Sequence, residues 1–135
     1  MRSKYLLTFA GISGAIAVML GAFAAHGLKA ILPEYLLGVF ETGVQYQFIH
    51  TLAILAILAC GALLQMKLGA KSQKYFFIAA ICFIIGTLCF SGSLYGLALT
   101  GIKWFGPITP FGGLLFIIGW GVFSFAALNI KEVTQ

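Results

Sequence analysis

Four long apolar stretches, separated by short polar connections, constrain the fold of this chain more than any other feature. They cover residues 5–25, 47–66, 75–99 and 108–130, and none contains Asp, Glu, Lys or Arg. Each is close to the ~20 residues with which an α-helix crosses the ~30 Å hydrocarbon core of a bilayer. Backbone polar groups in lipid must be satisfied internally, so runs of this length cross only as helices. The sequence therefore predicts an all-α integral membrane protein, a four-helix transmembrane bundle.

The composition supports a single membrane domain over residues 1–135. Hydrophobic residues make up 61% of the chain, charged residues 8%, and the mean hydropathy is +1.08. Four spans and their connections leave no room for a separate soluble domain. The net charge of +5 does not indicate nucleic-acid binding, because the basic residues flank the spans instead of forming a patch. At those positions they meet anionic lipid headgroups.

The distribution of basic residues predicts the orientation. Six basic residues lie at the two termini or in the middle connection: Arg2, Lys4, Lys67, Lys71, Lys74 and Lys131. The outer connections carry one each, Lys29 and Lys103. The positive-inside rule then places both termini on the cytoplasmic side of the plasma (bacterial inner) membrane. The alternative is a signal peptide cleaved after Ala22-Phe23-Ala24, but the first apolar run is about twice the usual length of a signal core.

Two connections share a pattern that suggests an internal repeat. Residues 27–33 (GLKAILP) and 101–107 (GIKWFGP) both read Gly, aliphatic, Lys, x, apolar, x, Pro. Convergence would explain this pattern, because Gly ends helices, Lys reaches the headgroups and Pro starts helices. Duplication of a helical hairpin is the alternative. It would relate the two halves by an axis along the membrane normal.

The segment after Pro33 is too long to be part of a simple span. A helix over residues 33–66 would measure roughly 50 Å at ~1.5 Å per residue, longer than the hydrocarbon core is thick. Either the segment bends near Gly43, or residues 33–44 form a short amphipathic helix in the outer interface. We adopt the interfacial helix as the expectation.

Small residues predict close contacts between helices. Rows at four-residue spacing occur in the first and third stretches and include Gly14, Gly21, Gly92 and Gly96. Such rows let helix backbones approach closely, within a tight bundle or along a homodimer seam. The three cysteines, an odd number, all lie within apolar stretches, which indicates packing and argues against disulfides or a zinc site.

Polar side chains gather at the outer ends of the predicted helices. The candidates for ligand or proton binding are His26, Glu41, Gln45, Tyr46, His50, Ser91, Ser93, Tyr95 and Thr109. Polar groups in lipid seek the bundle interior and pair there. We therefore expect one polar pocket that opens on the outer surface. His50 should point into the bundle and hydrogen-bond Ser91, Ser93 or Tyr95.

Each candidate also has a structural interpretation. The serines, Tyr95 and His50 would serve as interhelical hydrogen bonds. A proton-binding pair of His50 and Glu41 is the functional alternative. A metal or haem held by His26 and His50 is disfavoured, because the chain has only two histidines and no further donor cluster. We expect no metal and no cofactor.

Four motifs give the chain a resemblance that covers nearly its whole length. They are residues 20–28 (LGAFAAHGL), 40–50 (FETGVQYQFIH), 90–95 (FSGSLY) and 109–113 (TPFGG). The chain resembles small bacterial membrane proteins, the YgdD- and YwdK-like proteins, catalogued as domain-of-unknown-function family four-twenty-three. Ala24 departs from the family, which usually has Gly there. The resemblance implies a four-helix inner-membrane protein, and it brings no established activity.

Three classes of function follow. The first is a binding or transport module that uses the outer pocket. The second is a structural or accessory membrane protein whose polar cluster is interhelical packing. An enzyme is the weakest, because the sequence has no nucleophile–base motif and no carboxylate pair inside the spans. The expected partners are membrane lipids, with a homo-oligomer or another membrane protein as alternatives, and no nucleic acid.

Overall fold

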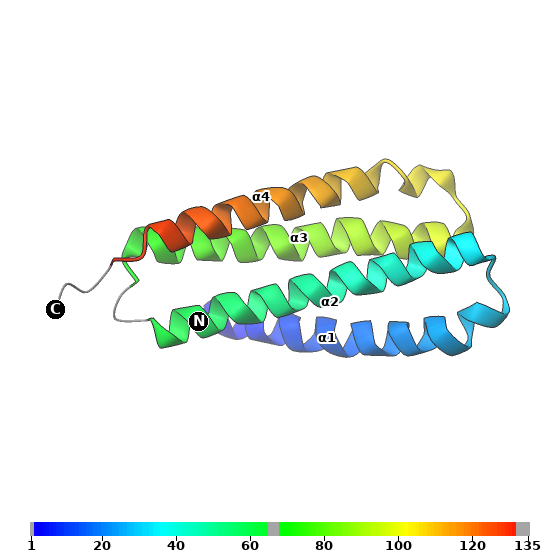
Figure 1. The fold of residues 1–135 in the computed structure, drawn as a ribbon, viewed down its shortest axis with the longest axis horizontal. Coiled ribbons are helices and arrows are strands. Elements are labelled where there is room, and N and C mark those ends of the chain that lie inside the picture. The colour runs from blue at the N-terminus through cyan, green and yellow to red at the C-terminus, as the bar shows by residue number, and fades with distance from the viewer. Residues whose placement is uncertain (1, 65–67, 132–135) are drawn as a thin grey trace.

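Four long helices make up the computed structural model, which describes residues 2–64 and 68–131 (Figure 1). The helices are α1 (Arg2–His26), α2 (Glu34–Leu63), α3 (Ala70–Thr100) and α4 (Ile108–Leu128). Two short 3-10 helices, η1 (Leu28–Ala30) and η2 (Lys103–Phe105), lie in the α1–α2 and α3–α4 connections. All four long helices are long and apolar enough to cross a membrane. The predicted all-α, four-span fold is confirmed.

Proline and glycine set several helix ends. Pro33 precedes α2 in an extended conformation, and Glu34 places an acid in the first turn, beside the positive end of the helix dipole. Helix α3 ends at Thr100 and is followed by Gly101, whose φ of 69° is left-handed and favours glycine. Pro107 precedes α4. These residues fix the two connections where η1 and η2 lie.

The predicted interfacial helix over residues 33–44 is wrong. From Glu34 to residue 44, this segment belongs to α2, which is one uninterrupted helix of 30 residues. The reason is packing: Phe40 is completely buried and lies in a cluster with Ala24, Leu28 and Ala98. This contact with α1, η1 and α3 holds the first turns of α2 in the bundle. Residues 65 and 66, which end the predicted second span, lie outside the described residues. Lys67 and Gln135, on which the predicted orientation and its test depend, also lie outside them.

Consecutive helices pack against each other, most extensively α3 with α4. Figure 1 shows α2 running obliquely, with its N-terminal end beside α3 and its C-terminal end beside α1. We call the end of the bundle that holds η1 and η2 the loop end. The opposite end, where α1 begins and α4 ends, is the terminus end. The α1–α2 hairpin and the α3–α4 hairpin are therefore in closest contact at the loop end.

Glycines allow α3 and α4 to approach closely. A Cβ added to Gly112 would lie 2.4 Å from the backbone nitrogen of Phe90. Added carbons at Gly86 and Gly119 would each lie 2.7 Å from a phenylalanine ring of the facing helix. These three positions have no room for a side chain. Close approach at small residues is the usual way in which helices associate in lipid.

The predicted packing glycines differ in their surroundings. Gly14 and Gly21 lie on the α1–α2 contact, where added Cβ atoms would be 3.7 Å from Thr51 and 3.5 Å from Val44. Gly96 lies against the ring of Phe105. Gly92 is wrong as a packing position within this chain, because it is exposed and an added Cβ meets no atom within 4 Å. The four-residue spacing alone does not show which side of a helix faces a neighbour.

Candidate functional site

Gln47 joins three helices at the centre of the bundle. Its side chain is buried, with 6% exposed. Its Nε2 donates to the backbone oxygen of Ser13 on α1 at 2.9 Å and to the Ser13 hydroxyl at 3.3 Å. Its Oε1 accepts a hydrogen bond of 2.6 Å from the Tyr95 hydroxyl on α3. An amide with donors and an acceptor suits this position, because both ends are satisfied.

Further hydrogen bonds extend this arrangement to all four helices. The hydroxyls of Ser13 and Thr51 lie 2.8 Å apart between α1 and α2. Ser91 on α3 donates to the backbone oxygen of Gly43 on α2 at 2.7 Å. The hydroxyls of Ser93 and Thr109 lie 2.6 Å apart between α3 and α4. We call these bonds, with those of Gln47 and His50, the interhelical network.

His50 lies at the contact of α2, α3 and α4. Its ring stacks on Phe116 with 3.5 Å between centroids and 6° between planes. Its Nδ1 is 2.7 Å from the carbonyl oxygen of Tyr46, and its Nε2 is 3.2 Å from the Trp120 Nε1. A carbonyl only accepts and an indole N–H only donates. Both bonds are therefore made by a neutral imidazole whose proton is on Nδ1.

The prediction that His50 points into the bundle and bonds to another helix is confirmed. The predicted partners Ser91, Ser93 and Tyr95 are wrong, because each makes another hydrogen bond. The observed partner, Trp120, comes from α4. The sequence offered no pairing signal, since an indole in an apolar helix is equally suited to face lipid.

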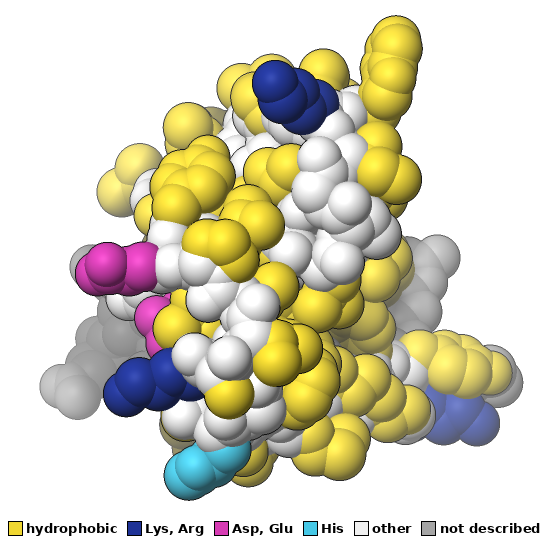
Figure 2. Space-filling view, turned by 90° about the vertical axis from the view of Figure 1, so that its right-hand side faces the viewer, with side chains coloured by type: hydrophobic (Ala, Val, Ile, Leu, Met, Phe, Trp, Pro, Cys, Tyr) yellow, Lys and Arg dark blue, Asp and Glu magenta, His cyan; other side chains and the backbone are white. Residues whose placement is uncertain are grey.

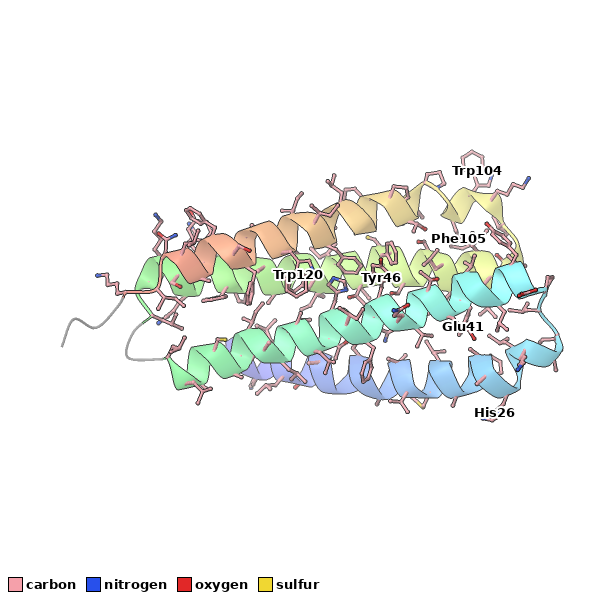
Figure 3. All side chains as sticks on the ribbon, viewed as in Figure 1. His26, Glu41, Tyr46, Trp104, Phe105 and Trp120 are labelled. Atoms are coloured by element: carbon pink, nitrogen blue, oxygen red, sulfur yellow. The ribbon has the colours of Figure 1, made fainter. Side chains whose placement is uncertain are left out.

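The structure does not bring the candidates for the predicted polar pocket together among the residues that it describes. His26, Glu41, Gln45 and Tyr46 are exposed. Figure 3 shows His26 and Glu41 near the loop end, and Tyr46 and Trp120 nearer the middle of the bundle. The remaining candidates are hydrogen-bonded within the bundle, Ser93 to Thr109, Tyr95 to Gln47, His50 to Trp120 and Ser91 to a backbone oxygen. The side chains that could bind a ligand are thus either used within the bundle or separated on its surface.

Glu41 and His50 do not form the proton-binding pair considered from the sequence. They are nine positions apart on α2, which corresponds to roughly 13 Å along the axis at ~1.5 Å per residue. Glu41 is exposed and His50 is 3% exposed. Within residues 2–64 and 68–131, no three His, Cys, Asp or Glu side chains gather as metal ligands.

A cleft of about 670 Å³ lies at the terminus end, between α1, α2 and the start of α3. Its lining is mainly apolar and includes Leu6, Leu7, Ile57, Leu58, Phe76 and Phe77. Polar side chains also reach it, from Ser3, Gln73 and Lys74. This volume is within the range of small-molecule sites. The sequence did not predict the cleft, because ordinary apolar residues form it where helices diverge.

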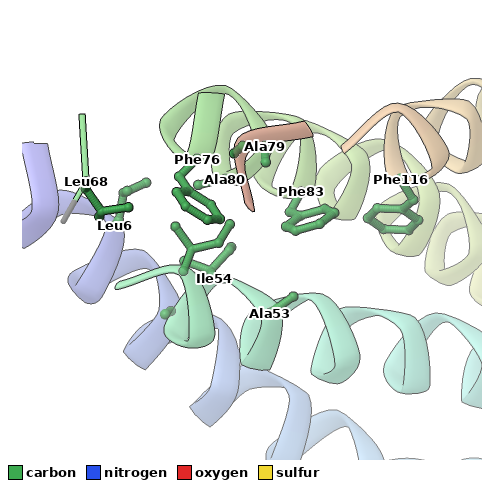
Figure 4. Close-up of a cluster of buried hydrophobic side chains, with 12 residues drawn as sticks. Leu6, Ala53, Ile54, Leu68, Phe76, Ala79, Ala80, Phe83 and Phe116 are labelled. Carbon is green, nitrogen blue, oxygen red and sulfur yellow. The ribbon is translucent and has the colours of Figure 1, made fainter. Parts of the chain in front are cut away.

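A cluster of buried apolar side chains, drawn in Figure 4, lies between the cleft and the interhelical network. Ile54 and Phe83 are completely buried, as are Ala79 and Ala80. On α2, Ile54 lies between Ile57, which lines the cleft, and His50 in the interhelical network. His50 and Ile57 are seven positions apart on α2 (57 − 50), so about two helical turns separate the cleft from His50.

The two ends of the molecule differ in charge. At the terminus end, the described charged side chains are Lys4, Lys71, Lys74 and Lys131. The acidic side chains in the described ranges, Glu34 and Glu41, both lie toward the loop end. Figure 2, which faces the loop end, shows acidic, basic and histidine side chains together on that surface. Only the terminus end is uniformly basic among the residues described.

Comparisons with known proteins place the chain in a family. The model of the family described as "Protein of unknown function (DUF423)" matches residues 20–113. The UPF0382 inner membrane protein YgdD of Escherichia coli (strain K12) is 38% identical over 132 residues, which is 98% of this chain and 95% of that protein.

Two further relatives show the same extent of similarity. A UPF0382 membrane protein of Haemophilus influenzae is 41% identical over 133 residues, with 98% of this chain and 100% of the relative covered. The UPF0382 membrane protein YwdK of Bacillus subtilis (strain 168) is 39% identical over 126 residues, with 93% and 98% covered. No solved structure matches the chain.

Proposed function

The chain belongs to the DUF423 family of membrane proteins of unknown function, and we propose that it is a binding module for the apolar part of an amphiphile. The observation that carries the proposal is the cleft of about 670 Å³ at the terminus end. Its apolar lining suits a hydrocarbon chain, and Ser3, Gln73 and Lys74 supply polar groups for a head. The binding site is thus at the opposite end from the one that the sequence suggested.

Binding fits the arrangement better than transport does. A substrate that crossed the bundle would have to pass the apolar cluster that contains Ile54 and Phe83, which are completely buried. Beyond that cluster it would meet the interhelical network, whose donors and acceptors are already bonded to each other. Along this route, Thr87 is the buried side chain among the described residues whose hydroxyl has no hydrogen-bond partner, so a polar solute would find few free groups. The arrangement therefore favours binding in the cleft over passage through the bundle.

The interhelical network then has a supporting role. Its bonds connect α1 with α2, α2 with α3 and α4, and α3 with α4. These contacts hold the helices together from the middle of the bundle to the loop end. At the terminus end, Ser72 on α3 donates to the backbone oxygen of Ala126 on α4 at 2.8 Å, so the helices diverge there between α1–α2 and the start of α3. The proposal is one of binding and assigns no reaction to the cleft.

The positive-inside rule would place this cleft in the cytoplasmic leaflet. The lysines of the terminus end are the ones on which the predicted orientation rests. Membrane lipids of that leaflet are then the amphiphiles most available to the cleft. Both termini would lie in the cytoplasm.

A structural or accessory role is the second candidate. It is favoured by the completeness of the hydrogen bonding around Gln47, since a fully bonded polar network needs no ligand. In that case the cleft would be filled by any lipid chain, without retention, and the function would be assembly with another membrane protein.

Filling the cleft distinguishes the two candidates. Gly61 lines the cleft, and a Cβ added there meets no atom within 4 Å. Gly61→Phe should therefore fill the cleft without disturbing the helices. Gly92→Phe is the matched control, because Gly92 is also free of contacts within 4 Å but lies on α3 beyond the middle of the bundle.

Native mass spectrometry after extraction in mild detergent measures the result. The wild type and Gly92→Phe should retain bound lipid, and Gly61→Phe should lose most of it at unchanged thermal stability. If Gly61→Phe retains as much lipid as the control, the cleft is not a binding site and the accessory role is the better explanation.

A further inference from the structure

We propose that the amphiphile in the cleft is an anionic phospholipid whose phosphate-bearing headgroup is bound by Lys74. This inference rests on the proposed binding function and names the ligand class of the same site. Lys74 is the described lysine that lines the cleft, and its side chain is exposed. Phe77 lies three positions after Lys74 on α3, which places the two side chains on the same face of the helix, and Phe77 lines the same cleft.

The cleft has the polarity that a phospholipid requires. Leu6, Ile57 and Phe76 are buried in its apolar part, with 4–6% of their surface exposed. Lys74 lies near the start of α3, toward the polar edge of the membrane. A lysine has an apolar stem and a charged tip, so it can cover a lipid chain and reach its headgroup at the same time. The ammonium of Lys74 is then next to the phosphate.

The neighbouring polar groups have other partners. Gln73 donates its side-chain amide to the backbone oxygen of Leu68 at 3.2 Å. The Lys71 ammonium lies 5.2 Å from the centre of the Phe125 ring, on the α4 side of α3. The Lys4 ammonium lies 5.1 Å from the Tyr5 ring. Among the cations that the structure describes, Lys74 is therefore the one that lines the cleft, whereas Lys71 and Lys4 contribute only to the general electrostatic potential of this end.

The charge of this end selects against other headgroups. The charged side chains described there are all lysines, and Glu34 and Glu41 lie toward the opposite end. A zwitterionic headgroup carries a positive group beside its phosphate. At this surface that positive group would lie near lysines and would have no acidic partner among the described residues. An anionic headgroup such as that of phosphatidylglycerol carries no positive group, so it is favoured by the lysines around it.

Lipid competition in nanodiscs tests the inference. The probe is an equal mixture of phosphatidylglycerol and phosphatidylcholine with identical acyl chains, and native mass spectrometry counts the two lipids retained by the protein. The wild type should retain more phosphatidylglycerol. Lys74→Gln should lower the ratio of the two lipids about fivefold, the factor for one lysine near a membrane surface. Lys74→Arg should keep most of the preference.

Lys71→Gln is the matched control, since it removes the same charge one turn away on the same helix but outside the cleft. It should change the ratio little. Equal effects of Lys74→Gln and Lys71→Gln would overturn the inference, because they would indicate general surface potential. A wild type that retains both lipids equally, and loses both in Gly61→Phe, would overturn the headgroup assignment but support the binding function. If Gly61→Phe retains as much of the two lipids as the wild type does, both the headgroup assignment and the binding function would be overturned.

Discussion

Replacing Gly112 by alanine should separate α3 from α4. The added Cβ would lie 2.4 Å from the backbone nitrogen of Phe90 and 2.8 Å from its Cα. The near limit of ordinary contact is 3.4 Å, so the backbones must move apart by about 1 Å (3.4 − 2.4) at this point. Backbone atoms cannot rotate away as a side chain can. The whole contact between the two helices has to adjust.

The expected loss of stability follows from that displacement. Overpacking at a well-packed contact typically costs about 1–3 kcal/mol. A radial gap of about 0.5–1 Å removes roughly a quarter to a half of each van der Waals attraction, and the contacts at Gly86 and Gly119 lie on the same interface. Alanine recovers about 0.5–1 kcal/mol as a better helix former. We expect a net loss of about 2 kcal/mol in the free energy of unfolding.

The neighbouring glycine provides the control. A Cβ added to Gly113 would lie 3.7 Å from the Phe90 ring, an ordinary contact. Gly113→Ala should therefore keep or slightly raise the stability. Unfolding by SDS in mixed micelles, followed by tryptophan fluorescence, measures both variants. Trp120 lies 4.9 Å from the Phe83 ring across the α3–α4 contact and reports its separation.

Equal stability of Gly112→Ala and Gly113→Ala would refute the reasoning. It would mean that the two backbones are not in contact at Gly112, and that the close approach of α3 and α4 does not occur. A larger loss for Gly113→Ala would mean that α4 is rotated relative to the arrangement described.

Four further predictions concern the network, the orientation and the repeat. Gln47→Leu should lower the free energy of unfolding by about 1–3 kcal/mol in the same assay, because it leaves buried partners unbonded, whereas Gln45→Leu at an exposed site should change it little. Thr87 has a buried hydroxyl without a partner in the described part of the chain, so Thr87→Val should be neutral or stabilising by up to about 1 kcal/mol, and Thr51→Val should be destabilising. Reporter fusions at Gln135 and in the α2–α3 connection should both report the cytoplasm, and an external C-terminus would contradict the four-span orientation. The α1–α2 and α3–α4 hairpins should superpose by rotation about the membrane normal, and an inverted axis would indicate convergence of the two connections.

The number and positions of the spanning helices could be predicted, because a charge-free run of about 20 residues has few alternatives in a membrane. The separate helix over residues 33–44 was predicted wrongly from length alone. Phe40 packs against residues of α1, η1 and α3, and such a contact between distant segments overrides a limit set by bilayer thickness. Local patterns do not contain this information.

The sequence predicted the burial of His50 but not its surroundings. In lipid, the outside of a helix is as apolar as the inside, so composition does not show how each helix is rotated. Gln47 became the centre of the network and Gln45 remained exposed, although they are two positions apart. The cleft left no sequence signal, since it depends on the angle between α2 and α3.

The interhelical network also decides where the molecule can deform. Apolar helix surfaces in lipid slide past each other at little cost, but the bonds of Gln47 with Ser13 and Tyr95 fix both the depth and the rotation of α2. A shift of α2 by one turn, about 5.4 Å, would break them together. Around the cleft, Leu6, Ile57 and Phe76 meet only through apolar contacts, which tolerate small displacements. Thermal motion that widens or narrows the bundle should therefore concentrate at the terminus end, where α1 and α2 diverge from the start of α3 and a lipid chain could enter between apolar side chains.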